Sequence, residues 1–366
     1  MSERSGELTA STVSTASTAL TAFTARVAAA ADSGLFQLLR GALGDEPARA
    51  AFARVQVVQA LLRPAGERVS RAELAQALNM ALFLDVTDRV PMAAAYVADL
   101  QRAVVENQLL PVALPPGEAA ITRVLRPLGF AMAATYPLPR LKMTGRAWRH
   151  ADFPEDIAQF FVSELHPERF SGSFQEAVTR VLSTSQDPLA PGELALLEQL
   201  ARDGELPTAS AVALLPKLVG CFARQHALFE ADDYQLLLSE SAEMAWIATE
   251  GNAFNHATDR VADIESVVAA QRALDRPVKD TIETSATGRV RQTAFKAARV
   301  MREFLDRGQR VRLEVPGSFH EFIQRAPLDE SGALDLAFDA GNATGIFKMT
   351  AGAAKDADTA GEAAAC

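Results

Sequence analysis

The chain of 366 residues contains few of the side chains on which metal and redox chemistry usually depend. It has only two cysteines, Cys221 and Cys366, which excludes a disulfide framework and a zinc site of the CxxC type. It has only five histidines, and none precedes residue 150: His150, His166, His226, His256 and His320. Any chemistry that requires histidine must therefore draw on this short list.

Basic charge and long apolar runs are also scarce. The sequence has 36 basic and 46 acidic residues, a formal net charge of −10, which argues against binding to nucleic acid or to an anionic membrane. No stretch of 18 uninterrupted apolar residues occurs, and the first residues lack the apolar core of a secretory signal. With so few cysteines, we expect a protein of the reducing cytoplasm. The sequence carries no signal for an oligomeric state.

Three common catalytic motifs are absent. We find no GxSxG, no P-loop, and no GxGxxG followed by an acidic residue. Serine-hydrolase, nucleotide-hydrolase and dinucleotide-binding functions therefore lack their sequence signatures.

The composition indicates one domain between two polar ends. Residues 1–45 are predicted as an N-terminal arm that is rich in Ser, Thr and Ala, and residues 351–366 as a disordered tail. Residues 46–350 are predicted as a single domain of catalytic type, with a helical insertion at about 172–240. No short repeat is present, which excludes solenoids and propellers.

Apolar periodicity alternates between helical and strand spacing along this domain. Ser70 opens an S-x-x-E capping box that predicts the start of a helix. Further helices are expected at 48–64, 91–102, 118–125 and 263–274, and strands within 130–148, at 157–165, 278–284, 289–295, 311–315 and 319–323. A helix followed by several antiparallel strands, occurring twice around a helical insertion, indicates an α+β fold.

Two segments near the C-terminal end concentrate polar groups, residues 250–260 and 315–325. On a strand, Phe319, Glu321 and Ile323 share one face, while His320 points to the other. A carboxylate between two apolar side chains is unfavourable unless it is paired with an arginine or bound to a metal, and both alternatives stay open.

The other histidines carry weaker signals. Taken alone, His256 suits a turn or a helix cap as well as a metal ligand. We expect His166 and His226 to be structural, whereas His150 lies beside two arginines that suit an anionic ligand.

Several separated motifs resemble one enzyme family. Residues 255–260 (NHATDR), 291–297 (RQTAFKA), 317–325 (GSFHEFIQR), 161–165 (FVSEL) and 342–348 (NATGIFK) look like the 2-oxoadipate dioxygenase/decarboxylases, also called hydroxyglutarate synthases. The motifs occur in the family's order, and the resemblance covers roughly residues 45–350.

This resemblance implies a fold, a cofactor and a reaction. The fold would resemble that of the vicinal-oxygen-chelate enzymes, with a curved mixed sheet around a mononuclear metal. The cofactor would be Fe(II), held by two histidines and one carboxylate, an arrangement that leaves positions open for substrate and O₂. The reaction would convert 2-oxoadipate to 2-hydroxyglutarate in lysine breakdown. By resemblance, His256 and Glu321 are metal ligands.

The first half of the chain departs from the family pattern. There the family carries a strand of the form Asp-His-Gly-Ala-x-Arg, which supplies the other histidine and an arginine for the substrate carboxylate. Residues 104–112 (VVENQLLPV) contain neither, and no histidine precedes His150. Asn107 or Gln108 offers a carboxamide oxygen, a weaker iron ligand than imidazole. His150 is the other possible substitute.

Three functions therefore remain open. The first is an Fe(II)-dependent dioxygenase/decarboxylase of 2-oxo dicarboxylic acids with an altered first half-site. The second is a catalytically impaired member that binds a small acid or a protein partner, and the third is a member with a different oxidation. Candidate substrate-binding residues, chosen by strand position and charge, are Arg146, Arg149, Gln292, Thr293 and Lys296.

Overall fold

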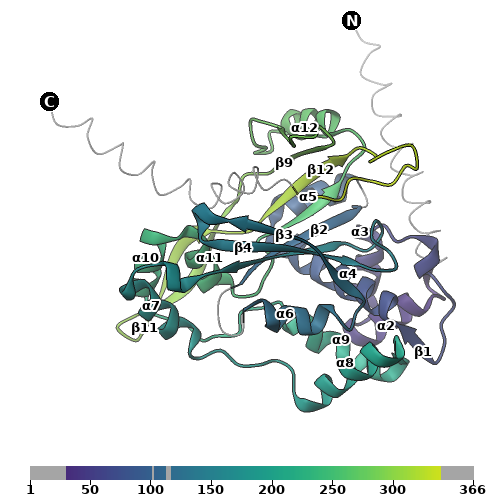
Figure 1. Ribbon diagram of the computed structural model, residues 1–366, viewed down its shortest axis with the longest axis horizontal. Coiled ribbons are helices and arrows are strands. Elements are labelled where there is room, and N and C mark those ends of the chain that lie inside the picture. The colour runs from purple at the N-terminus through teal and green to yellow at the C-terminus, as the bar shows by residue number, and fades with distance from the viewer. Residues whose placement is uncertain (1–29, 101–102, 113–116, 339–366) are drawn as a thin grey trace, which may run out of the picture.

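A computed structural model describes residues 30–100, 103–112 and 117–338. Its centre is an eight-stranded mixed sheet with the order β3-β4-β5-β2-β7-β12-β9-β8 (Figure 1). The strands of this sheet are β2 (Val105–Val112), β3 (Phe130–Leu138), β4 (Met143–His150), β5 (Gln159–Leu165), β7 (His256–Arg260), β8 (Glu283–Thr284), β9 (Val290–Ala294) and β12 (Phe319–Arg325). The expected α+β architecture, with a mixed sheet and a helical insertion, is confirmed.

The sheet consists of two halves with the same arrangement of strands. In the first half, β2 leads through α6 (Glu118–Leu125) to the antiparallel strands β3, β4 and β5, and β5 returns to pair parallel with β2. In the second half, β7 leads through α12 (Ile264–Ala273) to β8 and β9, and β12 pairs parallel with β7. The halves meet where β2 and β7 pair antiparallel, at the middle of the sheet.

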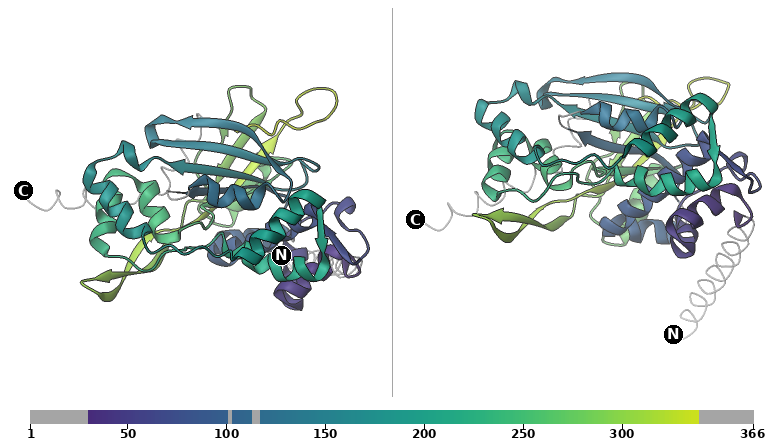
Figure 2. Two further views of the ribbon diagram at one scale, coloured as in Figure 1. Left: turned by 60° about the horizontal axis from the view of Figure 1, so that its bottom comes forward. Right: turned by 90° about the horizontal axis from the view of Figure 1, so that it is seen from below.

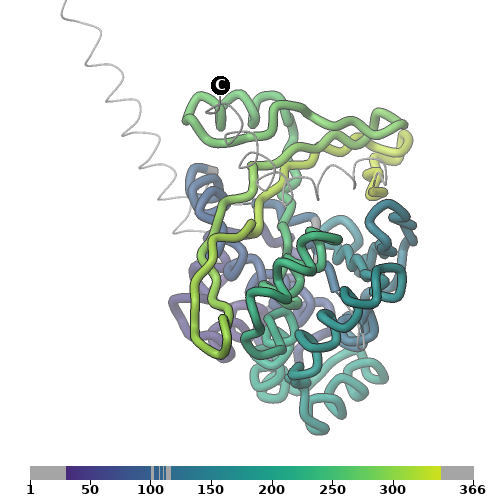
Figure 3. The backbone as a smooth tube through the Cα atoms, turned by 90° about the vertical axis from the view of Figure 1, so that its left-hand side faces the viewer, coloured from purple at the N-terminus to yellow at the C-terminus, as the bar shows by residue number. Residues whose placement is uncertain are grey.

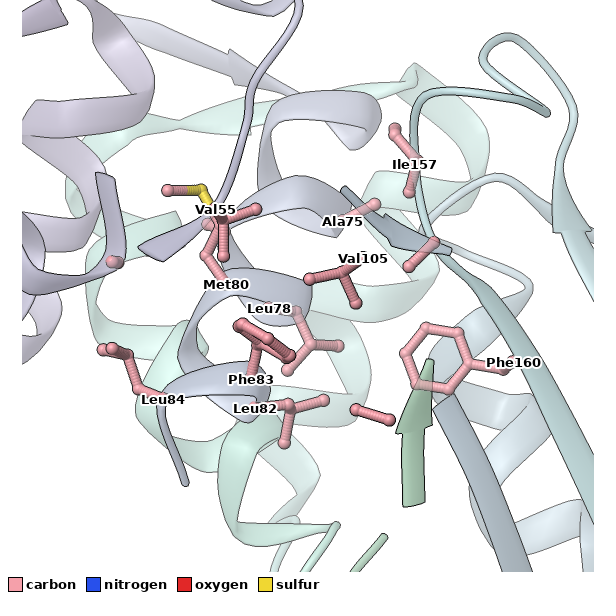
Figure 4. Packing of buried hydrophobic residues seen from close by; sticks show 14 of the residues in the cluster. Val55, Ala75, Leu78, Met80, Leu82, Phe83, Leu84, Val105, Ile157 and Phe160 are labelled. Carbon is pink, nitrogen blue, oxygen red and sulfur yellow. The ribbon is translucent and has the colours of Figure 1, made fainter. Parts of the chain in front are cut away.

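One face of the sheet packs against α4 (Arg71–Arg89) and α5 (Pro91–Leu100), and we call it the α4 face. Ser70 caps α4, and its capping box with Glu73 is confirmed. Figure 4 shows Leu78, Phe83 and Phe160 in the apolar core between α4 and the sheet. Removing these side chains from water is the main force that holds the layers together.

The expected N-terminal arm lies partly in the folded core, and the expected C-terminal tail lies outside the described residues. Residues 1–29 and 339–366, including the 342–348 motif, lie outside the described residues. The sequence interpretation extended the arm to residue 45, whereas Gly34–Leu43 forms α2, whose Leu35, Phe36 and Leu38 are buried. Helix α3 (Asp45–Arg54) follows at once, so this region is part of the core.

The region between the two halves is largely helical, as expected. It contains α7 (Gly172–Leu182), α8 (Pro191–Asp203), α9 (Thr208–Gly220), α10 (Ala231–Glu240) and α11 (Ala242–Glu250), and a short ribbon pairs β1 (Arg68–Ser70) with β6 (Glu205–Pro207). Helices α8 and α9 join the α2–α4 layer, whereas α7, α10 and α11 form a second group (Figure 2).

A two-stranded ribbon interrupts the second half. Strands β10 (Arg299–Asp306) and β11 (Gln309–Pro316) pair only with each other among the described strands. Figure 3 shows this ribbon reaching away from the main sheet. Phe304 attaches this ribbon to the second group of helices through ring contacts with Phe229 and with Tyr234 of α10.

Candidate functional site

The parallel pairing of β7 and β12 brings together the two side chains that the sequence singled out. Phe319 lies opposite His256 and Glu321 opposite Thr258, so the alternation predicted for residues 319–323 is confirmed. His256 Nε2 lies 3.6 Å from Glu321 Oε2. We call the side of the sheet that carries this pair the site face. It is opposite the α4 face, where His320 contacts Phe83 and Tyr96.

Glu321 is a buried carboxyl group without an arginine partner among the described ion pairs. Its side chain is 6% exposed, and Thr258 Oγ1 donates a hydrogen bond of 2.8 Å to Oε2. Burial raises its pKa to about 7, because the charged form loses hydration. The Glu283 carboxylate raises this pKa further, whereas Thr258, Lys279 and Arg325 lower it.

His256 is a buried neutral imidazole. Its ring stacks on Phe319 with 4.7 Å between centroids, and Nδ1 lies 3.4 Å from the side-chain oxygen of Asn255. Burial lowers its pKa to about 3, and the charges of His320 and Lys279 act in the same direction. The unprotonated nitrogen of a neutral imidazole can accept a proton, or it can donate its electron pair to a metal ion.

The turn before β7 positions His256. Helix α11 ends at Gly251, which has a φ of 63°. A Cβ atom at this position would lie 2.3 Å from the backbone of Arg224, so only glycine fits the turn. Asn255 N then donates to Leu109 O at 3.0 Å, which sets the register in which β7 enters the sheet beside β2.

The predicted carboxamide ligands lie on β2. Leu109 stands opposite His256 and Asn107 opposite Thr258 in the antiparallel register. The side chain of Asn107 is outside the described part of the structure. Gln108 points to the α4 face, where its Nε2 donates to Asn79 O at 3.3 Å, so the structure does not bring it to His256.

The predicted substrate arginines lie on opposite faces of β4. Arg149 is on the site face, where its Nε donates to Gln159 Oε1 at 2.9 Å. Arg146 points to the other side and pairs with Glu118 and Glu164 at 2.9 and 3.2 Å. Arg149 therefore stays a candidate, and Arg146 is already neutralised elsewhere.

The three candidates near β9 are also separated. Gln292 is on the site face, with its Nε2 3.5 Å from Glu283 Oε2. Thr293 is on the α4 face, where its hydroxyl donates to Thr281 O at 2.9 Å. Lys296 is exposed.

The remaining histidines do not join the pair. His150 is on the α4 face at the end of β4, and its Nδ1 accepts from the backbone N–H groups of Asp152 and Phe153 at 3.2 Å each. His166 bonds to Thr144 at 2.7 Å, and His226 Nε2 lies 2.8 Å from Ala248 O, as expected of structural histidines.

The sequence interpretation missed two charged groups beside the pair. Lys279 N donates to Ala294 O at 2.9 Å, and Ala294 lies opposite Glu321 in the β9–β12 register. Lys279 Nζ lies 2.6 Å from Glu283 Oε1. The sequence carries no signal for this position, because the place of Lys279 and Glu283 beside Glu321 follows from the sheet register.

A family model for 2-oxoadipate dioxygenase/decarboxylases matches residues 112–336, more than half of the chain. The chain belongs to this family. These are oxidoreductase-type enzymes, and the sequence motifs resemble the same family. No curated protein gave a match. The described part of the chain contains no helix that is long and apolar enough to cross a membrane.

Solved structures show where the fold recurs. A glyoxalase-superfamily protein from Ralstonia eutropha JMP134 is 51% identical, with a TM-score of 0.80 over 84% of this chain and 99% of that chain. The hydroxyglutarate synthase from Oryza sativa in complex with 2-oxoadipate is 17% identical, with a TM-score of 0.60 over 79% and 95%. The Pseudomonas putida enzyme in the same complex is 20% identical, with a TM-score of 0.59 over 81% and 76%.

The donor set does not fit the iron site that the resemblance implies. Such a site needs two imidazoles and one carboxylate on one face of the metal. Among the described residues, no third His, Cys, Asp or Glu side chain joins His256 and Glu321 to form a metal-binding group. The position opposite His256 is occupied by Leu109, which packs into an apolar cluster.

Proposed function

We propose that this chain binds a small 2-oxo dicarboxylic acid of the 2-oxoadipate type on its site face, without efficient iron-dependent turnover. The observation that carries this proposal is the His256–Glu321 pair, with its 3.6 Å separation and with the apolar Leu109 opposite His256. Family membership supports the ligand class, and two structural relatives were solved with 2-oxoadipate bound.

The chemistry of the pair suits the carbonyl end of such an acid. Thr258 holds one oxygen of Glu321, and Phe319 fixes the plane of the His256 ring. A carboxyl group with a pKa near 7 can donate a hydrogen bond to a keto or carboxylate oxygen while it is protonated. Both groups are nearly inaccessible to water, which strengthens each polar contact they make with a ligand.

A second candidate function keeps the full chemistry of the family. In it, the chain is an Fe(II)-dependent enzyme that takes up O₂, releases CO₂ and converts 2-oxoadipate to 2-hydroxyglutarate in lysine breakdown in the cytoplasm. The retention of His256 beside Glu321 favours this function, because these two residues match the family's motifs. It also requires a third metal ligand, and no third His, Cys, Asp or Glu among the described residues joins the pair.

One experiment separates the two functions. The full chain is loaded anaerobically with Fe(II), desalted and analysed for bound iron, and O₂ uptake is then followed with 2-oxoadipate. Binding of 2-oxoadipate to the metal-free chain is measured by calorimetry. We expect 2-oxoadipate to bind in the calorimeter, with iron far below one per chain and no O₂ uptake.

The second function predicts the opposite result in this experiment. One iron per chain, with O₂ uptake that His256→Ala abolishes, would establish the second function and overturn the first. The matched control is His166→Ala, which removes a partly buried histidine that bonds to Thr144 away from the pair. Absence of both binding and uptake contradicts both functions.

A further inference from the structure

A cluster of arginines lies on the site face, beyond the His256–Glu321 pair. Arg260 and Arg325 end β7 and β12, and Arg149 lies near the end of β4. We call these three side chains, together with Gln159 and Glu106, the arginine cluster. Glu106 accepts a hydrogen bond from Arg325 Nε and lies 3.7 Å from Arg260 Nε, so strands from both halves of the sheet meet here.

The cluster has an excess of buried positive charge. Two of the three guanidinium groups, Arg325 and Arg260, pair with one internal carboxylate, Glu106, whose side chain is 3% exposed. The side chains of Arg325 and Arg260 are 0% and 19% exposed. The nearby Asp335 is bound by Arg289, with Nε and Oδ2 3.0 Å apart. Burying like charges is costly unless an anion neutralises them.

Donors in the cluster remain unused. Arg260 Nη1, Arg325 Nη2 and Gln159 Nε2 are buried and have no hydrogen-bond partner among the described residues, and one acceptor of the cluster, Glu106 Oε2, also has none. The donors come from three strands, β7, β12 and β5. Buried donors are nearly always bonded in folded proteins, so three in one cluster can serve a ligand with several acceptor oxygens.

Other donors of the same arginines are bound by a segment that covers the cluster. Residues 327–338, which we call the strap, cross from the end of β12 to β3 and β4. Arg149 Nη2 donates to Leu336 O at 2.8 Å, and Arg325 Nη1 donates to Ala337 O at 2.8 Å. Phe338 N donates to the Tyr136 hydroxyl at 3.1 Å. These neutral carbonyls orient the guanidinium groups without neutralising their charge.

We propose that the arginine cluster binds the distal carboxylate of the 2-oxo acid, with Arg260 and Arg325 determining the preference for dicarboxylic acids; this inference rests on the proposed function. Arg260 follows Thr258 by two residues on the same face of β7, a step of about 6.6 Å along the strand. A short dicarboxylate can therefore reach from the pair to the cluster. These arginines take the role of the arginine that the first-half motif lacks.

The lowered pKa of Arg149 agrees with this assignment. Burial is the main cause, and the charge of Arg325 lowers this pKa further, whereas Tyr136, Asp335 and Glu106 raise it. A bound carboxylate would neutralise this repulsion. Carboxylates also match the planar geometry of guanidinium donors, which favours them over anions of other shapes.

The test compares two ligands that differ only at the distal end. Calorimetry measures the binding of 2-oxoadipate and of 2-oxohexanoate, which has a methyl group in place of the distal carboxylate. We expect the wild-type chain to prefer 2-oxoadipate by roughly 10- to 100-fold, as for a lost charge-assisted hydrogen bond. In Arg260→Gln this preference should fall well below the wild-type value while the affinity for 2-oxohexanoate is unchanged, and Arg260→Lys should keep more of it.

Arg302→Gln is the matched control. It removes a guanidinium group from a partly buried ion pair with Glu250, whose closest atoms are 2.6 Å apart, outside the cluster. Its preference should equal that of the wild-type chain. Equal binding of both acids by the wild-type chain overturns the inference but leaves the proposed function intact. Binding of neither acid overturns the proposed function and the inference with it.

Discussion

The two halves of the sheet share one order of strands but place different chemistry on the site face. In the second half, His256, Thr258 and Glu321 occupy neighbouring positions of β7 and β12. In the first half, the corresponding region of β2 and β5 presents Leu109 and Phe161, which lie opposite each other and pack into one apolar cluster. Apolar packing maintains a fold whether or not a ligand is kept, so one half of a metal site can be lost without loss of the architecture.

The largest expected effect comes from making the first half resemble the second. Leu109→His places an imidazole opposite His256, where paired residues have Cβ atoms roughly 5 Å apart. Together with Glu321, the two imidazoles would complete a donor set of two histidines and one carboxylate. We expect Co(II) binding to rise from far below one ion per chain to one, measured by visible absorption and elemental analysis.

Two further variants make this result decisive. The double variant Leu109→His/His256→Ala should lose the bound Co(II), because it restores a single imidazole. If circular dichroism shows that Leu109→His is unfolded, Asn107→His tests the position opposite Thr258 instead. A folded histidine variant that binds no Co(II) would show that the two halves differ by more than one ligand.

The second expected effect is a pH dependence of stability that originates in the second half. Burial raises the pKa of Glu321 from its ordinary value of 4.5 to about 7. Its protonated form therefore favours the folded state below pH 4.5, and this stability is lost as the pH rises to about 7. The loss is on the order of 3 kcal/mol for a shift of this size. Glu321→Gln should consequently be more stable than the wild-type chain at pH 8, and similar to it at pH 4.5.

Urea denaturation at pH 4.5 and pH 8 measures this difference. The matched control in the first half is Glu164→Gln, which removes a carboxylate that Arg146 neutralises. The free energy of unfolding of Glu164→Gln at pH 8 should not exceed that of the wild-type chain. Asp259, whose pKa burial also raises to about 7, contributes in the same direction and remains in both variants. Equal stability of Glu321→Gln and the wild-type chain at pH 8 would contradict the assignment.

The sequence predicted the second half of the site better than the arginine cluster. The alternation of residues 319–323 placed Glu321 between Phe319 and Ile323 on one face, and the register of β12 confirms it. That prediction needs only one strand. Arg325 meets Glu106, 219 positions earlier in the chain, because β12, β7 and β2 are neighbours in the sheet. Such long-range contacts depend on the topology, which local periodicity does not contain.

The sequence also could not show which of two adjacent residues on a strand points to the site face. Gln292 and Thr293 are both buried, so burial alone could not show which of them lies on the site face. On β2, a register shift between Val105 and Asn107 determines the faces of the residues that follow, and it directs Gln108 to the α4 face. An irregularity of this kind inverts the alternation that a sequence pattern would assume.

The smallest expected effect comes from the hydrogen bond that Thr258 donates to Glu321. Thr258→Val keeps the shape of the side chain but removes the 2.8 Å donation to Glu321 Oε2, which lowers the pKa of Glu321. That pKa should rise in the variant, and the free energy of unfolding should fall by about 1 kcal/mol.

The carboxyl ¹³C resonance of Glu321, followed through a pH titration, reports the pKa. Thr293→Val removes a comparable hydrogen bond on the α4 face and should leave this titration unchanged. An equal response to both variants would mean that Glu321 senses general destabilisation, and that the site face gives it no specific partner.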